Sequence, residues 1–257
     1  MKPFAFILLF IGLLMLSGFV RMMFPPDINF LIYGILGCVA GYLTVFIFLR
    51  IEKKAWADFG FSWDRYTILR FLSGVGIGII LMTAIVLSLV SLTALRIRYE
   101  PGLFDAKSLL MLLPIFPLAL MEEIGFRSYP QRKLNDEYGL WVSQIVVAVV
   151  FALYHILNGW TVGVAFSGPF VWAFIFGLAA IRSGGIAMPT GIHFALNILQ
   201  SLAGLKGNQA FLFKIDYPPG TVQSVMAKTD TVGFLLHGVA LIVFLVLTYY
   251  YSKRLKR

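Results

Sequence analysis

The chain has 257 residues, of which 60% are apolar and only 13% are charged, and its mean hydropathy is +0.87. Soluble domains carry roughly 25% charged residues, so this composition excludes a soluble globular protein and predicts a polytopic membrane protein. The formal net charge of +9 fits basic residues gathered in cytoplasmic loops, and no basic, aromatic-interleaved face predicts nucleic-acid binding.

Apolar runs long enough to cross a bilayer, which takes about 20 residues, recur along the whole chain. They predict an all-α fold, a polytopic membrane helical bundle of about eight transmembrane helices. We expect residues 1–257 to form a single integral membrane domain. The predicted helices cover residues 4–20, 28–49, 68–92, 108–124, 140–157, 162–181, 186–203 and 232–251.

The distribution of lysine and arginine predicts the orientation. The amino end, the 50–70 and 127–139 loops and the carboxyl tail belong to a set of segments with about twice as many cations as the opposite set. Basic loops face the cytoplasm, so both termini are predicted to be cytoplasmic, in what the short, compact chain suggests is a bacterial cytoplasmic membrane. The long 204–231 connection would then lie on the opposite side, as a simple connector or as a lid.

Two pairs of glycines predict close contacts between helices. Gly37 and Gly41 lie four residues apart in the second predicted helix, and Gly74 and Gly78 repeat this spacing in the third. Small residues at this spacing let two helix backbones approach closely within a membrane.

Two adjacent carboxylates, Glu122 and Glu123, interrupt the run predicted as the fourth helix. A charge in the hydrocarbon region costs at least about 2.5 kcal/mol, so it indicates function or pairing. Glu123 and Arg127 lie four residues apart and can pair on one helix face. Glu122 points about 100° away with no cation at helical spacing, which makes it a candidate general acid or base. The alternative is that both glutamates lie at the cytoplasmic end of this helix, solvated by water and headgroups.

The chain contains three histidines, and all three lie in apolar runs. His155 lies near the end of the fifth predicted helix. His193 lies in the seventh, and Asn197 follows it one turn later on the same face. His237 has no polar neighbour at helical spacing and is expected to be an interhelical hydrogen-bond partner. Embedded polar residues face a bundle interior or an aqueous cavity. Three predicted helices therefore offer a carboxylate from Glu122, an imidazole from His155, and an imidazole with an amide from His193 and Asn197. This set predicts a site capable of hydrolytic chemistry.

Three short motifs carry a resemblance to a known family. Residues 122–127 fit EExxxR, residues 151–155 fit FxxxH, and residues 193–197 fit HxxxN. In this order, on separate hydrophobic segments, they resemble the CPBP family of intramembrane endopeptidases. That family includes the type II CAAX prenyl proteases and bacterial Abi-like proteins that process bacteriocins or confer immunity to them. The resemblance covers roughly residues 105–204, the expected catalytic core.

The resemblance implies a glutamate-type endopeptidase that needs no cofactor. Glu122 would act with His155 to activate a water molecule. His193 and Asn197 would stabilise the oxyanion of the tetrahedral intermediate. Glu123, paired with the arginine of its motif, would hold the local structure. The implied partners are membrane lipid and a membrane-anchored peptide or protein substrate, which could be prenylated or CAAX-like.

Two other functions remain open. Glu122, His155 and His193 could supply the two imidazoles and one carboxylate of a zinc site in a zinc-dependent membrane protease, although the chain has no H-E-x-x-H motif. Intramembrane Glu, His and Asn also form proton relays, so the protein could be a transporter, or a non-catalytic immunity or scaffold protein. No inverted repeat of the kind found in many transporters is evident.

The helix boundaries contain one inconsistency. At 1.5 Å per residue, His155 lies about 22 Å from the start of its predicted helix, whereas His193 lies only about 10 Å from the start of its own. Straight helices would therefore place the two imidazoles at different depths. Pro114, Pro117 and Pro130 permit kinks that could remove the difference.

Overall fold

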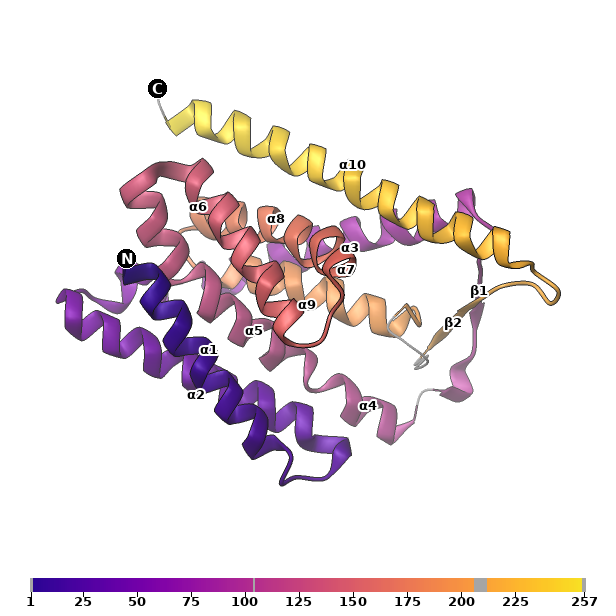
Figure 1. The fold of residues 1–257 in the computed structure, drawn as a ribbon, viewed down its shortest axis with the longest axis horizontal. Coiled ribbons are helices and arrows are strands. Elements are labelled where there is room, and N and C mark those ends of the chain that lie inside the picture. The colour runs from indigo at the N-terminus through magenta and orange to yellow at the C-terminus, as the bar shows by residue number, and fades with distance from the viewer. Residues whose placement is uncertain (1, 104, 206–211, 256–257) are drawn as a thin grey trace.

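The structure is a computed structural model, and it describes residues 2–103, 105–205 and 212–255. The chain folds into a helical bundle with one small two-stranded antiparallel sheet at one end (Figure 1). The elements are α1 (Lys2–Arg21), α2 (Pro26–Glu52), η1 (Trp56–Phe59), α3 (Thr67–Leu92), β1 (Arg96–Tyr99), η2 (Pro101–Leu103), α4 (Ala106–Leu112), α5 (Ile115–Arg127), α6 (Tyr129–Leu157), α7 (Val162–Ser167), α8 (Pro169–Ser183), α9 (Ala187–Leu202), β2 (Phe213–Asp216) and α10 (Gln223–Leu255).

Within the described residues, six helical segments are long and apolar enough to cross a membrane. The fold is thus the predicted all-α membrane bundle, and the protein is an integral membrane protein. The predicted count of eight is not confirmed, for two reasons. The segment 108–157, which holds two predicted spans, forms one apolar helical stretch. The predicted span 186–203 corresponds to α9, which has only 16 residues, fewer than the roughly 20 that a span requires. The predicted span 162–181 corresponds to the candidate span Val162–Ser183, which α7 and α8 form together.

Prolines mark two of these unexpected helix boundaries. Pro114 is the N-cap residue of α5 and separates it from α4, and Pro169 is the first residue of α8. Proline has no backbone N–H and fits the first turn of a helix, where that donor has no intrahelical partner. A run that is continuous in hydropathy therefore forms two helices in the folded chain.

The predicted 127–139 loop is mostly helical. Ser128 leaves the helical conformation (φ −75°, ψ −109°) and separates α5 from α6, which starts at Tyr129. The chain reverses later, at Gly139, whose φ of 83° and ψ of 173° divide α6 into two parts. A positive φ of this size suits glycine, which has no Cβ. Because the reversal comes 12 residues after Arg127, α5 can end well inside the bundle.

The glycine pairs lie at close helix contacts, as predicted. A Cβ on Gly37 would lie 2.2 Å from Met121 Sδ, and one on Gly41 would lie 2.6 Å from Ile124 Cγ2, so α2 packs directly on α5. A Cβ on Gly74 would lie 2.1 Å from the Met188 carbonyl oxygen, which joins α3 to α9.

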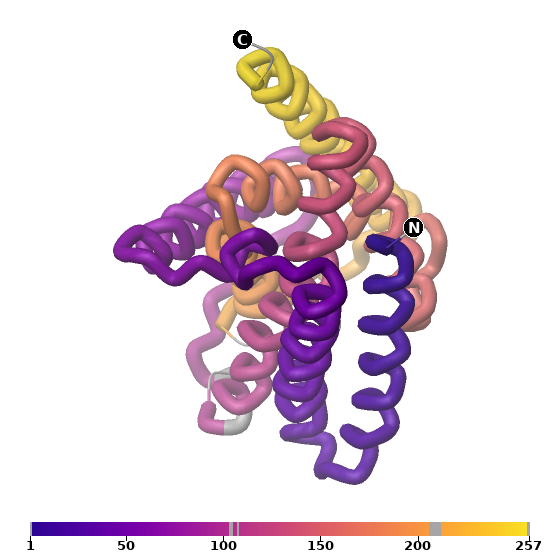
Figure 2. The backbone as a smooth tube through the Cα atoms, turned by 90° about the vertical axis from the view of Figure 1, so that its left-hand side faces the viewer, coloured from indigo at the N-terminus to yellow at the C-terminus, as the bar shows by residue number. Residues whose placement is uncertain are grey.

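These contacts place the two glutamates of α5 beside the middle of helix α2. The residues on either side of them, Met121 and Ile124, meet Gly37 and Gly41, whose midpoint is the centre of the 27-residue helix α2. At 1.5 Å per residue this level is about 20 Å from each end of α2. Figure 2 shows α2 running antiparallel to α1 along one side of the bundle.

Substitution of Gly74 is expected to destabilise the bundle. Gly74→Ala places a methyl group against the Met188 backbone, and overpacking of this kind costs about 1–3 kcal/mol. Gly76→Ala is the matched control, because nothing lies within 4 Å of a Cβ at that position in the same helix. Thermal unfolding in detergent should show a lower melting temperature for Gly74→Ala alone; equal melting temperatures would contradict the close contact.

The segment predicted as a connector, 204–231, is only partly a connector. Its residues 213–216 form β2, which pairs antiparallel with β1, and α10 begins at Gln223 instead of near residue 232. Residues 206–211 of this segment lie outside the described residues. Both strands come from loops that were predicted to share one side of the membrane, which agrees with their pairing.

The first turn of α1 and the last turn of α10 lie at the end of the bundle opposite the β1–β2 strand pair (Figure 1). Glu52 fastens this end: its carboxylate accepts hydrogen bonds from Tyr129 and Lys133 at 3.0 Å and forms an ion pair with Lys2 at 3.0 Å. Residues 256–257 of the basic tail lie outside the described residues. The location of the termini on one side agrees with the predicted topology, whose cytoplasmic assignment stays a prediction.

Candidate active site

Glu123 and Arg127 form a buried ion pair. Both side chains have an exposed fraction of 0%, and Arg127 Nε lies 3.5 Å from Glu123 Oε2. The guanidinium also lies over the ring of Phe151, 4.2 Å from its centroid. The alternative that both glutamates are solvated by headgroups is therefore wrong for Glu123, because α5 ends inside the bundle and not at its edge.

His193 lies between the two glutamates. Its Nδ1–H donates to Glu123 Oε1 at 2.8 Å, and its Nε2 lies 3.7 Å from Glu122 Oε2. The imidazole stacks on Phe176 with a centroid distance of 4.6 Å and an interplanar angle of 16°. The hydrogen bond and the stacked ring together fix the orientation of His193, with Nε2 directed toward Glu122.

Glu122 lies at the less enclosed edge of this cluster, with a side-chain exposed fraction of 13%. Its charge is within electrostatic range of Tyr33 and Tyr154, whose hydroxyls hydrogen-bond each other. The same two tyrosines line a hollow of about 150 Å³ between α1, α2 and α6. Glu122 is thus the more exposed of the two glutamates, whereas Glu123 lies within the packed core.

His155 joins the cluster through an aromatic ring. Its imidazole contacts Phe151 edge-on at 4.6 Å, and Phe151 contacts His193 edge-on at 6.4 Å. The His155 Nδ1–H donates to the Phe151 carbonyl oxygen at 2.8 Å, so the neutral ring presents Nε2 as its acceptor. This shared ring links the two helices that the boundaries in the sequence placed at different depths.

Asn197 lies one turn beyond His193 on α9 and is partly buried. The cluster thus joins Glu122, Glu123, Arg127 and His193 by direct contacts, His155 through Phe151, and Asn197 by its position on the His193 helix. His237, predicted as a structural histidine, packs edge-on against Trp172 at 6.0 Å and donates from Nδ1 to the Gly233 carbonyl oxygen.

Several residues that support the site were not predicted. Phe176 reaches His193 because α8 is held on α6 by a buried amide pair: Gln131 Nε2 donates to Gln144 Oε1 at 2.9 Å, and Gln144 Nε2 donates to the Phe174 carbonyl oxygen at 3.0 Å. Gly177 leaves room for both amides, since a Cβ there would lie 2.0 Å from Gln144 Oε1. In the sequence, two glutamines and a glycine in or beside apolar runs were the signal that could have indicated this polar contact between helices.

The groups in this cluster that could bind a metal are the carboxylates of Glu122 and Glu123 and the imidazoles of His155 and His193. Among the residues that the structure describes, no group of three or more His, Cys, Asp and Glu side chains is arranged to hold a metal ion. His193 Nδ1 already donates to Glu123, which leaves that ring one nitrogen for any further partner.

The interior of this integral membrane bundle thus holds two carboxylates, an imidazole and a guanidinium in contact with one another. Residues 104–199 match the family model described as type II CAAX prenyl endopeptidase Rce1-like. This match confirms the resemblance to the CPBP family over the segment that carries all three motifs, somewhat more than a third of the chain. The matched family is a family of proteases. In a comparison with curated proteins, the chain has no match.

Proposed function

We propose that the protein is an intramembrane endopeptidase that hydrolyses a peptide bond of a membrane-associated substrate with water activated by Glu122 and His155. The observation that carries the proposal is the location of His193 between Glu122 and Glu123, in a buried cluster about 20 Å from either end of α2. Residues 105–204 would form the catalytic core. The match to a protease family supports peptidase activity.

Hydrolysis can be written with Glu122 as both base and acid. The carboxylate takes a proton from water as the water oxygen attacks the scissile carbonyl carbon, which produces a tetrahedral oxyanion. The protonated carboxyl group then transfers that proton to the leaving amine as the C–N bond breaks. His155 would orient the water through its Nε2. Water would reach Glu122 from the hollow that Tyr33 and Tyr154 line.

Stabilisation of the oxyanion would come from α9. Removal of one well-placed donor to an oxyanion costs roughly 10²–10³ in rate. The Asn197 amide can donate directly, whereas His193 can donate through Nε2 only when it carries a second proton, since Nδ1–H is directed to Glu123. Glu123 and Arg127 would hold this imidazole in place and contact no substrate.

The reaction is proposed to need no metal. We expect EDTA or 1,10-phenanthroline to leave the rate of peptide cleavage within about twofold of the untreated enzyme, because general acid–base catalysis by Glu and His requires no metal ion. The measurement is cleavage of a fluorogenic peptide by purified protein, with the metal content determined in parallel. Loss of activity on chelation, restored by Zn²⁺, would favour the zinc-dependent alternative.

The proposed substrate is a membrane-anchored peptide or protein, which includes prenylated, CAAX-like ones. The proposed location of the protein is a bacterial cytoplasmic membrane, with both termini in the cytoplasm. The test is a proteomic comparison of membranes that contain either the native protein or Glu122→Gln. Peptides with new ends that appear only with the native protein would identify substrates. Identical membrane proteomes, together with no cleavage in vitro, would favour a non-catalytic immunity, scaffold or transport role.

A further inference from the structure

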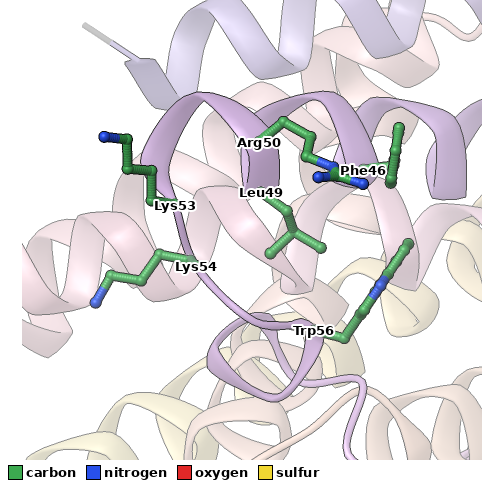
Figure 3. Close-up of a pocket in the computed structure, with 6 residues that line it drawn as sticks. All are labelled: Phe46, Leu49, Arg50, Lys53, Lys54 and Trp56. Atoms are coloured by element: carbon green, nitrogen blue, oxygen red, sulfur yellow. The ribbon is translucent and has the colours of Figure 1, made fainter.

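A second hollow, separate from the glutamate site, lies at the end of the bundle that carries the termini. It encloses about 390 Å³ and is lined by Phe46, Leu49, Arg50, Lys53, Lys54 and Trp56 (Figure 3). Three of these six residues are cations and three are apolar. The hollow lies beside Glu52, which pairs with Lys2 near the amino end of the chain.

The backbone after α2 builds this hollow by turning back on itself. Lys53 ends α2 in the left-handed conformation (φ 54°, ψ 46°), and its N–H donates to the Leu49 carbonyl oxygen. The chain then returns through η1 to lie beside α2. Trp56 and Phe61 pack on Tyr42 at centroid distances of 6.0 and 5.3 Å, so aromatic contacts hold η1 and the segment after it against α2.

The cations of the hollow are not neutralised by nearby carboxylates. Glu52, next to Lys53 in sequence, is turned into the bundle and engaged by Lys2 and Lys133. The Asp58 carboxylate accepts the Ala55 N–H at 2.9 Å. Arg50 lies over the Phe46 ring, 5.0 Å from its centroid, and in the described part of the chain none of Arg50, Lys53 and Lys54 forms an ion pair with a carboxylate.

We propose that this hollow binds the phosphate headgroup of an anionic phospholipid. Basic residues just beyond the end of a membrane-spanning helix attract anionic lipid headgroups, and tryptophan is enriched at this level of a membrane protein. The lipid chains would lie against the exposed apolar face of α2 below the hollow, where Val39 is 58% exposed and Leu43 47%. A membrane lipid is favoured over a free phosphate ion because the phosphate-binding cations adjoin this apolar face.

The conformation of Lys53 is an independent observation for this site. It is the one non-glycine residue with positive φ among residues 2–103, 105–205 and 212–255. Glycine is the usual residue at such a helix end, because a Cβ is unfavourable in the left-handed conformation. A lysine here retains a cation at the hollow where the backbone alone would favour glycine.

The experiment compares lipid binding by the full chain and by two variants that differ in their effect on the backbone. Native mass spectrometry of detergent-purified protein would measure binding of dioleoylphosphatidylglycerol, with dioleoylphosphatidylcholine as the zwitterionic control of equal chain length. We expect the native protein to bind the anionic lipid at least about tenfold more tightly. Arg50→Gln/Lys54→Gln should abolish that preference, since each cation near an anionic headgroup contributes about fivefold.

Lys53→Gly separates binding from folding. It should weaken binding of the anionic lipid about fivefold, while the melting temperature stays equal to or above that of the native protein because the strained lysine is gone. The matched control, Lys253→Gln/Arg254→Gln, removes two cations of α10 and should change binding by less than twofold. Equal binding of both lipids, equal effects of the two double variants, or displacement of the lipid by millimolar inorganic phosphate would each overturn the proposal.

Discussion

Replacement of Glu122 by glutamine is expected to lower the rate of peptide cleavage by about 10³–10⁴-fold, because positioned proton transfer contributes up to about 10⁴-fold in enzymes. Glutamine keeps the size and the polarity of the side chain but cannot accept and return a proton. The melting temperature should stay close to that of the native protein, since Glu122 lies at the partly exposed edge of the cluster. Single-turnover cleavage of a membrane-anchored peptide by protein in nanodiscs is the measurement.

Two further variants make this experiment specific. His155→Ala should also abolish cleavage while the protein still folds, because the proposed water lies between Glu122 and His155. His237→Ala serves as the control: it removes a histidine that packs on Trp172 and should leave cleavage unchanged. Full proteolysis by Glu122→Ala would disprove the assignment of the general base.

Replacement of Arg127 by methionine is expected to lower the free energy of unfolding by about 3–5 kcal/mol, because it leaves a buried carboxylate without its cation. Glu123 and Arg127 are both fully buried, and the guanidinium lies against Phe151. Unfolding in mixed micelles with an increasing fraction of SDS would measure the change. Cleavage should fall as well, since Glu123 orients His193.

The double variant Glu123→Gln/Arg127→Met distinguishes the cost of an unpaired charge from the loss of packing. Replacement of both partners of a buried pair by neutral side chains of similar size is often neutral or stabilising, so this variant should recover most of the lost stability. A glutamine oxygen at position 123 could still accept the His193 Nδ1–H. Equal destabilisation by the single and double variants would show that packing of the arginine, and not its charge, supports the site.

Much of the site could be predicted because it depends on residue types that are costly in a membrane. Glu122, Glu123, His193 and Asn197 stand out in apolar runs, and the spacing of four residues correctly paired Glu123 with Arg127. The contacts of His193 with both glutamates could not be predicted. His193 was assigned only to stabilisation of the oxyanion, yet in the structure its two nitrogens face the two glutamates.

Hydropathy and glycine spacing were sufficient for the fold class, because burial of apolar side chains in lipid and close contact through small residues are local properties of a helix. The glycine spacing also predicted close helix contacts at α2 and α3, but only the folded chain shows that their partners are α5 and α9. The number of spans and the position of the candidate site residues along the bundle depended on the tertiary structure. Pro114 and Ser128 bound α5, and Gly139 delays the reversal of the chain until the middle of α6. Only the packing of α5 on α2 shows that the carboxyl end of α5 lies inside the bundle. A buried carboxylate there is stabilised by a cation or serves a function.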